Sequence, residues 1–102
     1  MASQNANDQD DFVKIILNAL SPMYNVVADV QEEDIALCKD GIIFAKIKTK
    51  QVFLLDYVGQ YTAVEQSLLD KLLVLKPQKS DLDNFLFKAT KAYWLACAQK
   101  NN

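Results

Sequence analysis

The spacing of apolar residues changes several times along the chain, and each change predicts an element. From residue 11 to residue 20 the apolar side chains recur at intervals of three and four, which is the spacing of one helix face. Asp10 or Asp11 is placed to cap this helix, and Ser21-Pro22 ends it. The preceding residues are polar and acidic, so we expect a disordered lead over residues 1–10.

The middle of the chain is rich in β-branched residues and carries a hairpin signal. Residues 35–39, 42–48 and 51–56 predict three consecutive antiparallel strands. Asp40-Gly41, between the first two, supplies the two positive-φ residues of a type I′ turn. Both faces of residues 42–48 are apolar near the turn, so we expect this strand to be central. Residues 26–30 are expected to be extended only briefly.

The last third of the chain is predicted to hold two helices with a strand between them. The composition of residues 61–69, after a break at Gly59, favours a helix. The run 71–76 fits a buried strand or a continuing helix, and we favour the strand because a β-branched Val precedes the stop at Pro77. A long helix follows over about 81–99, with Ser80 and Asp83 as a capping box. Its apolar stripe consists of Leu82, Phe85, Leu86, Ala89, Tyr93 and Ala96.

This order of elements predicts one α+β domain over residues 11–100, an antiparallel sheet of about four strands with helices packed on one face. A chain of 102 residues with 51% apolar content is long enough for one core and too short for two ordinary domains. It contains no run of 18 apolar residues and no signal-type apolar region, so we expect a cytoplasmic protein.

Composition narrows the chemistry that this domain can perform. The chain has 11 basic residues, all Lys, no His, and a net charge of −2. The absence of Arg argues against direct nucleic-acid recognition, and the absence of His excludes His-dependent triads and the common zinc-hydrolase layouts. Cys38 and Cys97 have no CxxC spacing, which predicts reduced, unpaired thiols. We therefore predict no catalytic, cofactor or metal site.

Two clusters of charged residues allow more than one functional interpretation. The acidic run Glu32-Glu33-Asp34, with Asp29 nearby, fits a solvated loop, a divalent-cation site or a contact for a basic partner. The alternating lysines Lys46, Lys48 and Lys50 fit a phosphate-binding row or a solvated strand face that discourages edge aggregation.

Phe87 and Trp94 give the last helix a second apolar side. They lie seven residues apart on one side of the last helix, away from the centre of its apolar stripe. This side either docks a protein partner, which includes a second copy in a homodimer, or packs against the first helix. The first helix offers a matching second stripe of Val13, Leu17 and Leu20.

Several segments resemble the TfoX amino-terminal domain family. They are a leading helix that ends in Leu20-Ser21-Pro22-Met23, the hairpin segment 37–47 with its Asp-Gly and Phe-Ala pairs, and the strand 52–56 with its final Asp. The predicted strand 72–77 and the Ala-rich last helix also fall where the family places them, so the resemblance covers residues 11–99. Where the family has Arg-Arg-Met-Phe-Gly-Gly, this chain has Asp29-Val30-Gln31-Glu32-Glu33-Asp34, in which acidic residues stand in place of basic residues and glycines.

The resemblance implies regulation through protein contacts. The family includes bacterial competence regulators that act with the cyclic-AMP receptor protein, often with a second, carboxy-terminal helical domain. This chain resembles a free-standing, divergent member without that domain. The alternative, from a different class, is an enzyme or small-ligand-binding protein with a pocket between sheet and helices, where Tyr57, Tyr61 or a buried Asp supplies the polar group.

Overall fold

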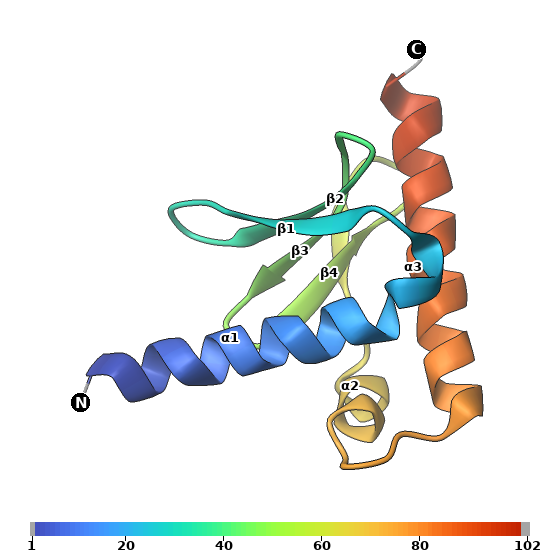
Figure 1. The fold of residues 1–102 in the computed structure, drawn as a ribbon. Coiled ribbons are helices and arrows are strands. Elements are labelled where there is room, and N and C mark those ends of the chain that lie inside the picture. The colour runs from blue at the N-terminus through green and yellow to red at the C-terminus, as the bar shows by residue number, and fades with distance from the viewer. Residues whose placement is uncertain (1, 101–102) are drawn as a thin grey trace.

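The computed structural model describes the backbone of residues 2–100 and the side chains of residues 9–100. Helix α1 (Ala2–Ala19) leads into the short 3-10 helix η1 (Ser21–Met23). Five strands follow, namely β1 (Val26–Val30), β2 (Ile35–Lys39), β3 (Ile42–Lys48), β4 (Gln51–Leu55) and β5 (Tyr61–Ala63). Helices α2 (Gln66–Leu72) and α3 (Lys79–Lys100) come last, so the fold is α+β as predicted (Figure 1).

The strands form one antiparallel sheet in the order β1-β2-β3-β4-β5, so β3 is central, as expected. Asp40 and Gly41 both have positive φ, 52° and 81°, which is the backbone of the predicted type I′ turn. Thr49 and Lys50 also have positive φ, 51° and 59°, and make a second two-residue turn between β3 and β4. This second turn contains no glycine, so both of its residues are held in a conformation that L side chains disfavour.

A β-bulge interrupts the ladder between β2 and β3. The register shifts between Leu37 and Cys38, which leaves Phe44 of β3 without a partner across the ladder. The Phe44 side chain is fully buried, and its ring meets the Tyr93 ring of α3 edge to face, with centroids 6.0 Å apart and planes at 87°. The bulge therefore directs the Phe44 ring into the interface between the sheet and α3.

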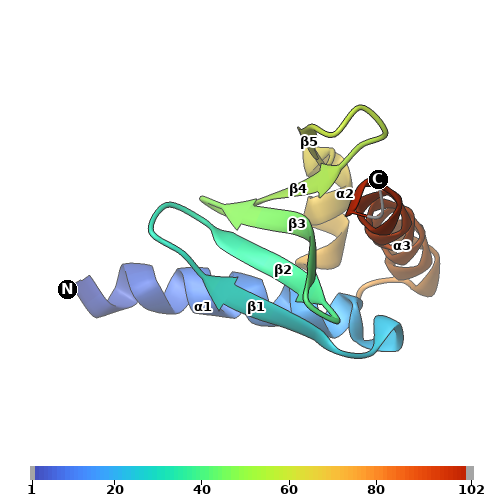
Figure 2. The same cartoon turned by 90° about the horizontal axis from the view of Figure 1, so that it is seen from above.

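The helices share one face of the sheet and enclose one core. Ile35, Ala45 and Ile47 point to that face, since directly paired residues lie on the same side of a sheet, and all three are buried. Figure 2 shows α1 crossing beneath β1, while α3 packs on β3 and β4 at the end of the sheet. The buried helix residues on this core are Phe12, Val13, Ile16, Ala19 and Leu20 of the first helix region, Leu68, Leu69 and Leu72 of α2, and Phe85, Ala89, Ala92 and Ala96 of α3.

Residues 26–30 form a complete strand, which corrects the expectation of a brief extension and raises the strand count from about four to five. Every residue of β1 is paired with β2, from Val26 opposite Lys39 to Val30 opposite Ile35. The Gln31 N–H closes the hairpin by donating to the Asp34 carbonyl at 2.9 Å. Pairing with a neighbouring strand thus gives these residues the partners that the isolated pattern did not reveal.

The prediction of a helix over residues 61–69 is wrong at its start. Tyr61–Ala63 is strand β5, paired with β4, and the next N–H, of Val64, donates to the Val52 carbonyl at 2.8 Å. Helix α2 begins only at Gln66. Tyr and Thr fit a pleated strand well, and the edge of β4 offers them backbone hydrogen bonds.

The predicted strand over 71–76 is also wrong. Helix α2 continues to Leu72, because Leu68, Leu69 and Leu72 have the i, i+1, i+4 spacing of a buried helix face. The apolar residues that follow lie in the loop before α3, where Leu75 is 96% exposed. The four consecutive apolar residues 72–75 are therefore divided between the end of α2 and the loop that follows it.

Both long helices begin earlier than predicted. The backbone of α1 is helical from Ala2, through the segment for which a disordered lead was expected, and Met1 lies outside the described residues. That segment contains no Gly or Pro that would end a helix. Helix α3 begins at Lys79, and the Gln78 carbonyl accepts the N–H groups of Asp81 and Leu82.

The predicted capping box is therefore wrong, because Ser80 lies inside the first turn of α3 rather than before it. The Asp83 carboxylate pairs instead with Lys79 Nζ at 2.9 Å, one turn earlier. None of the helices within the described part of the chain is long and apolar enough to cross a membrane.

Candidate functional site

The acidic run lies in the turn between β1 and β2, at the end of the sheet away from α3 (Figures 1 and 2). Glu32 and Glu33 are exposed, whereas the Asp34 carboxylate lies 3.8 Å from Lys46 Nζ. Within the described residues, no three His, Cys, Asp or Glu side chains gather as a metal-ligand set. The run is thus separate from Phe87 and Trp94, and one of its three carboxylates is already paired within the fold.

The lysines of β3 do not form a uniform row. Lys46 is half-buried, and its ammonium lies 4.9 Å from the centroid of the Tyr61 ring as well as beside Asp34. Burial raises the pKa of the Tyr61 phenol, and the neighbouring Cys38 and Asp34 raise it further. Lys48 is exposed. These contacts place Lys46 in an ion-pair and cation–π cluster with Asp34 and Tyr61.

The two cysteines are free thiols on different elements, as predicted. Burial raises the pKa of the Cys38 thiol, and the Asp29 carboxylate raises it further. Cys97 lies on α3, where a hydrogen bond to its side chain is the main cause that raises the pKa of the Tyr93 phenol. A raised pKa keeps Cys38 in the protonated form, which is the less nucleophilic one.

Phe87 and Trp94 lie on the outer side of α3. Their side chains are 71% and 70% exposed, which is unusual for rings of this size. Phe85 and Ala89, on the opposite side of the helix, are fully buried against the sheet. The interpretation in which the two rings pack on the first helix is therefore wrong, because the side of α3 that faces the core is already set by its buried stripe.

The two rings bound a shallow groove of about 400 Å³. It is lined by Phe87, Thr90, Lys91, Trp94 and Leu95, and we call these five residues the aromatic face of α3. The Thr90 hydroxyl donates to the Leu86 carbonyl at 2.8 Å, so its polar hydrogen is used within the helix. Apart from the Lys91 ammonium and the indole N–H of Trp94, the groove therefore offers an apolar surface.

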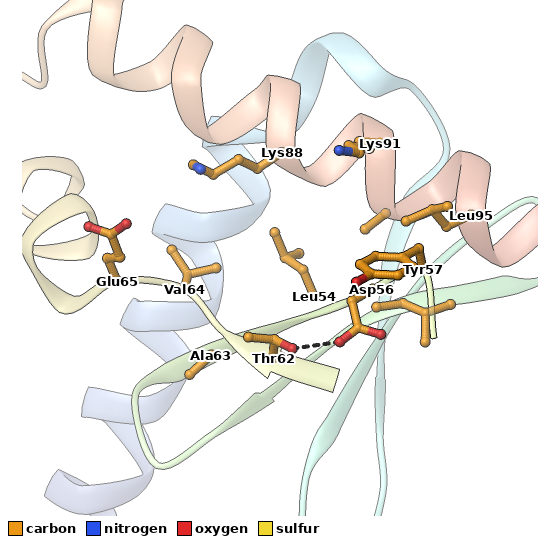
Figure 3. A pocket seen from close by; sticks show the side chains of 12 residues that line it. Leu54, Asp56, Tyr57, Thr62, Ala63, Val64, Glu65, Lys88, Lys91 and Leu95 are labelled. Atoms are coloured by element: carbon orange, nitrogen blue, oxygen red, sulfur yellow. Dashed lines mark hydrogen bonds between the residues drawn. The ribbon is translucent and has the colours of Figure 1, made fainter. Parts of the chain in front are cut away.

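A second hollow, of about 260 Å³, adjoins this groove between α3 and the hairpin of β4 and β5. Figure 3 shows Lys88, Lys91 and Leu95 of α3 along one side of it, with Tyr57 and Thr62 on the other. Lys91 and Leu95 line both hollows. Because Tyr57 is 82% exposed, the aromatic surface continues from α3 onto the turn after β4.

Asp56 and Thr62, two of the polar residues that line this second hollow, are engaged within the fold. The Asp56 carboxylate accepts the N–H groups of Val58 and Gln60 at 3.0 and 2.9 Å, and the Thr62 hydroxyl donates to its other oxygen at 2.9 Å (Figure 3). These bonds, the one from Gln60 above all, lower the pKa of Asp56. Tyr61, the other tyrosine of the ligand-binding alternative, lines a different hollow.

Comparison with family models, with curated proteins and with solved structures gives no match to this chain. Fold and surface together define the class of protein as an α+β domain whose long last helix exposes an aromatic face. The sequence indicated Phe87 and Trp94 by their helical spacing, and the same spacing places Lys88 and Lys91 beside them. The position of Tyr57 next to Leu95 depends on tertiary packing and had no local signal.

Proposed function

We propose that this protein is a small regulatory domain that acts through protein–protein contacts, and that the aromatic face of α3 is its contact surface. The observation that carries the proposal is the pair of rings, Phe87 and Trp94, each about 70% exposed on one side of a single helix. Exposed aromatic side chains are costly to leave in water, and they are enriched among the residues that dominate binding energy at interfaces.

The support beneath the two rings also favours a contact function. Helix α3 is 22 residues long, and its inner side is anchored in the core by Phe85, Ala89 and Ala92. The helix is thus held in place before any partner arrives, so binding costs little conformational entropy. The carboxylate of the neighbouring hollow, Asp56, is already held by Val58, Gln60 and Thr62, and for this reason we favour a contact surface over a ligand pocket.

The regulatory class comes from the resemblance to the TfoX amino-terminal family. A leading helix that ends at Ser21-Pro22, an Asp40-Gly41 hairpin and an Ala-rich last helix support it. The segment 72–77, where the family places a strand, is a helix end and a loop in this chain. A cytoplasmic location belongs to the same proposal.

In vivo cross-linking tests the proposed surface. A photo-reactive residue in place of the exposed Ala98, one helical turn after Trp94, would lie at the end of the aromatic face. The same residue at exposed Glu32, in the distant β1–β2 turn, is the control. We expect a discrete protein cross-linked from position 98 only, and its loss when Phe87→Ala and Trp94→Ala are introduced. Failure to cross-link from position 98, or the same products from both positions, would contradict the proposal.

A further inference from the structure

From the charges and shape of the aromatic face we infer that its partner is an amphipathic α-helix with acidic side chains beside its apolar stripe, an inference that rests on the proposed contact function. Lys88 and Lys91 follow Phe87 by one and four residues, and both are exposed. Among the described residues neither lysine makes an ion pair or a hydrogen bond, although Glu65 lines the same hollow as both. The edge of the face thus carries two positive charges that the fold does not neutralise.

The partner's secondary structure follows from backbone hydrogen bonding. Helix α3 uses its own N–H and C=O groups within the helix, so its aromatic face offers none to an incoming chain. An extended segment laid on this face would lose water from its backbone groups without gaining partners for them. A helix satisfies its backbone internally and therefore fits the surface at a lower cost.

The spacing of the anchors also fits a helix. Phe87 and Trp94 are seven residues apart, which is about 10.5 Å along the helix axis, the distance between residues i and i+7 of a second helix. Thr90, the smallest side chain of the face, lies between them and leaves room for a partner side chain at i+3 or i+4. Acidic residues of the partner would then meet Lys91 within the groove and Lys88 beside it.

A second copy of this chain would bring like charges together at this surface. In a twofold antiparallel pairing of two α3 helices, Phe87 would meet the other copy's Trp94, but the two Lys91 side chains would both lie next to the twofold axis. The nearest acidic residue along the face, Asp83, is already paired with Lys79 at 2.9 Å. Like charges at the centre therefore disfavour the homodimer at this surface.

Trp94 provides the experiment with its reporter, because it is the only Trp of the chain. The probe is a helical peptide with Leu at i, i+3, i+4 and i+7 and Glu at the flanking positions, and a matched peptide carries Lys in place of each Glu. We expect the Glu peptide to shift the Trp94 emission to shorter wavelength and to bind at least about tenfold more tightly than the Lys peptide. The double variant Lys88→Glu, Lys91→Glu should reverse this preference while its circular dichroism stays unchanged.

Each other outcome overturns the inference in a distinguishable way. Equal binding of both peptides, or of neither while position 98 still cross-links a protein, rejects the acidic helix and leaves the contact function standing. If neither peptide binds and no protein cross-links from position 98, both the acidic-helix partner and the proposed contact function are rejected. If the Trp94 emission shifts with protein concentration and without peptide, and light scattering shows a doubled mass, the face binds a second copy of the chain. If only a single-stranded oligonucleotide shifts the Trp94 emission, the aromatic face binds nucleic acid.

Discussion

At the scale of single residues, Gly41 determines the geometry of the central hairpin. Its φ is +81°, and no atom lies within 4 Å of the position that a Cβ would occupy. A side chain would therefore fit in space, and its cost would come from backbone strain alone. We expect Gly41→Val to lower the free energy of unfolding by about 1–3 kcal/mol, measured by urea denaturation. Gly41→Asn is the matched control, because Asn tolerates positive φ; equal stability of the Val variant and the wild type would contradict the prediction.

Asp56 gives the fold a predictable response to acid. Because its pKa is lowered in the folded protein, its contribution to stability is complete above the ordinary Asp pKa and is lost as pH falls through the lowered value. We expect the melting temperature of the wild type to fall more steeply below about pH 4 than that of Asp56→Asn. Melting curves at pH 7 and pH 3 measure this difference. Equal decreases in melting temperature for both proteins would show that other carboxylates determine the acid sensitivity.

At the scale of elements, the two sides of α3 predict opposite results for two truncations of aromatic rings. Trp94 is 70% exposed, so Trp94→Ala should change the free energy of unfolding by no more than about 0.5 kcal/mol. Phe85 is fully buried, and Phe85→Ala should cost about 3–5 kcal/mol because it leaves a cavity. Chemical denaturation of both variants measures the contrast. A strongly destabilised Trp94→Ala would place that ring in the core and remove the contact surface.

Strand β1 is the longer of the two sheet edges, and little protects it. Four of its five residues are apolar, and Val27 and Val30 are 58% and 78% exposed. The strand has no Pro and no Lys, so Asp29 is its only charge against edge-to-edge pairing. We expect Asp29→Val to aggregate at a lower temperature than the wild type, measured by light scattering during heating. Asp29→Lys keeps a charge at this position and should resemble the wild type; aggregation of both variants alike would point to another edge.

The elements that the sequence predicted correctly are those with short-range signals. Asp40-Gly41 and Ser21-Pro22 fix their turns through the conformations that their own residues allow. Tyr61–Ala63 had no such signal, because it becomes a strand only through the free edge of β4. For the candidate site, helical spacing was enough to place Phe87 and Trp94 together. It was not enough to decide whether they were buried, since that depends on which side of α3 the sheet covers.

At the scale of the whole molecule, one core joins α1, the sheet and α3. Ile16 of α1 is fully buried in the same hydrophobic cluster as Phe44 of β3 and Phe85 of α3. We expect Ile16→Ala to cost about 2–5 kcal/mol and to lower the melting of helix and sheet together. Far-ultraviolet and near-ultraviolet circular dichroism should therefore give coincident transitions in wild type and variant. Separate transitions would show that α1 unfolds as an independent unit.

The uninterrupted strand order also has a consequence for synthesis on the ribosome. Each strand pairs with the strand made just before it, so β1 to β5 can assemble through short loop closures as the chain emerges. The part of the core face that α3 covers, on β3 and β4, then stays uncovered until α3, which follows the strands in the chain, docks on it. During that interval the nascent protein exposes apolar residues of its future core. Docking of α3 buries them, and the same step fixes Phe87 and Trp94 on the outer surface of the folded protein.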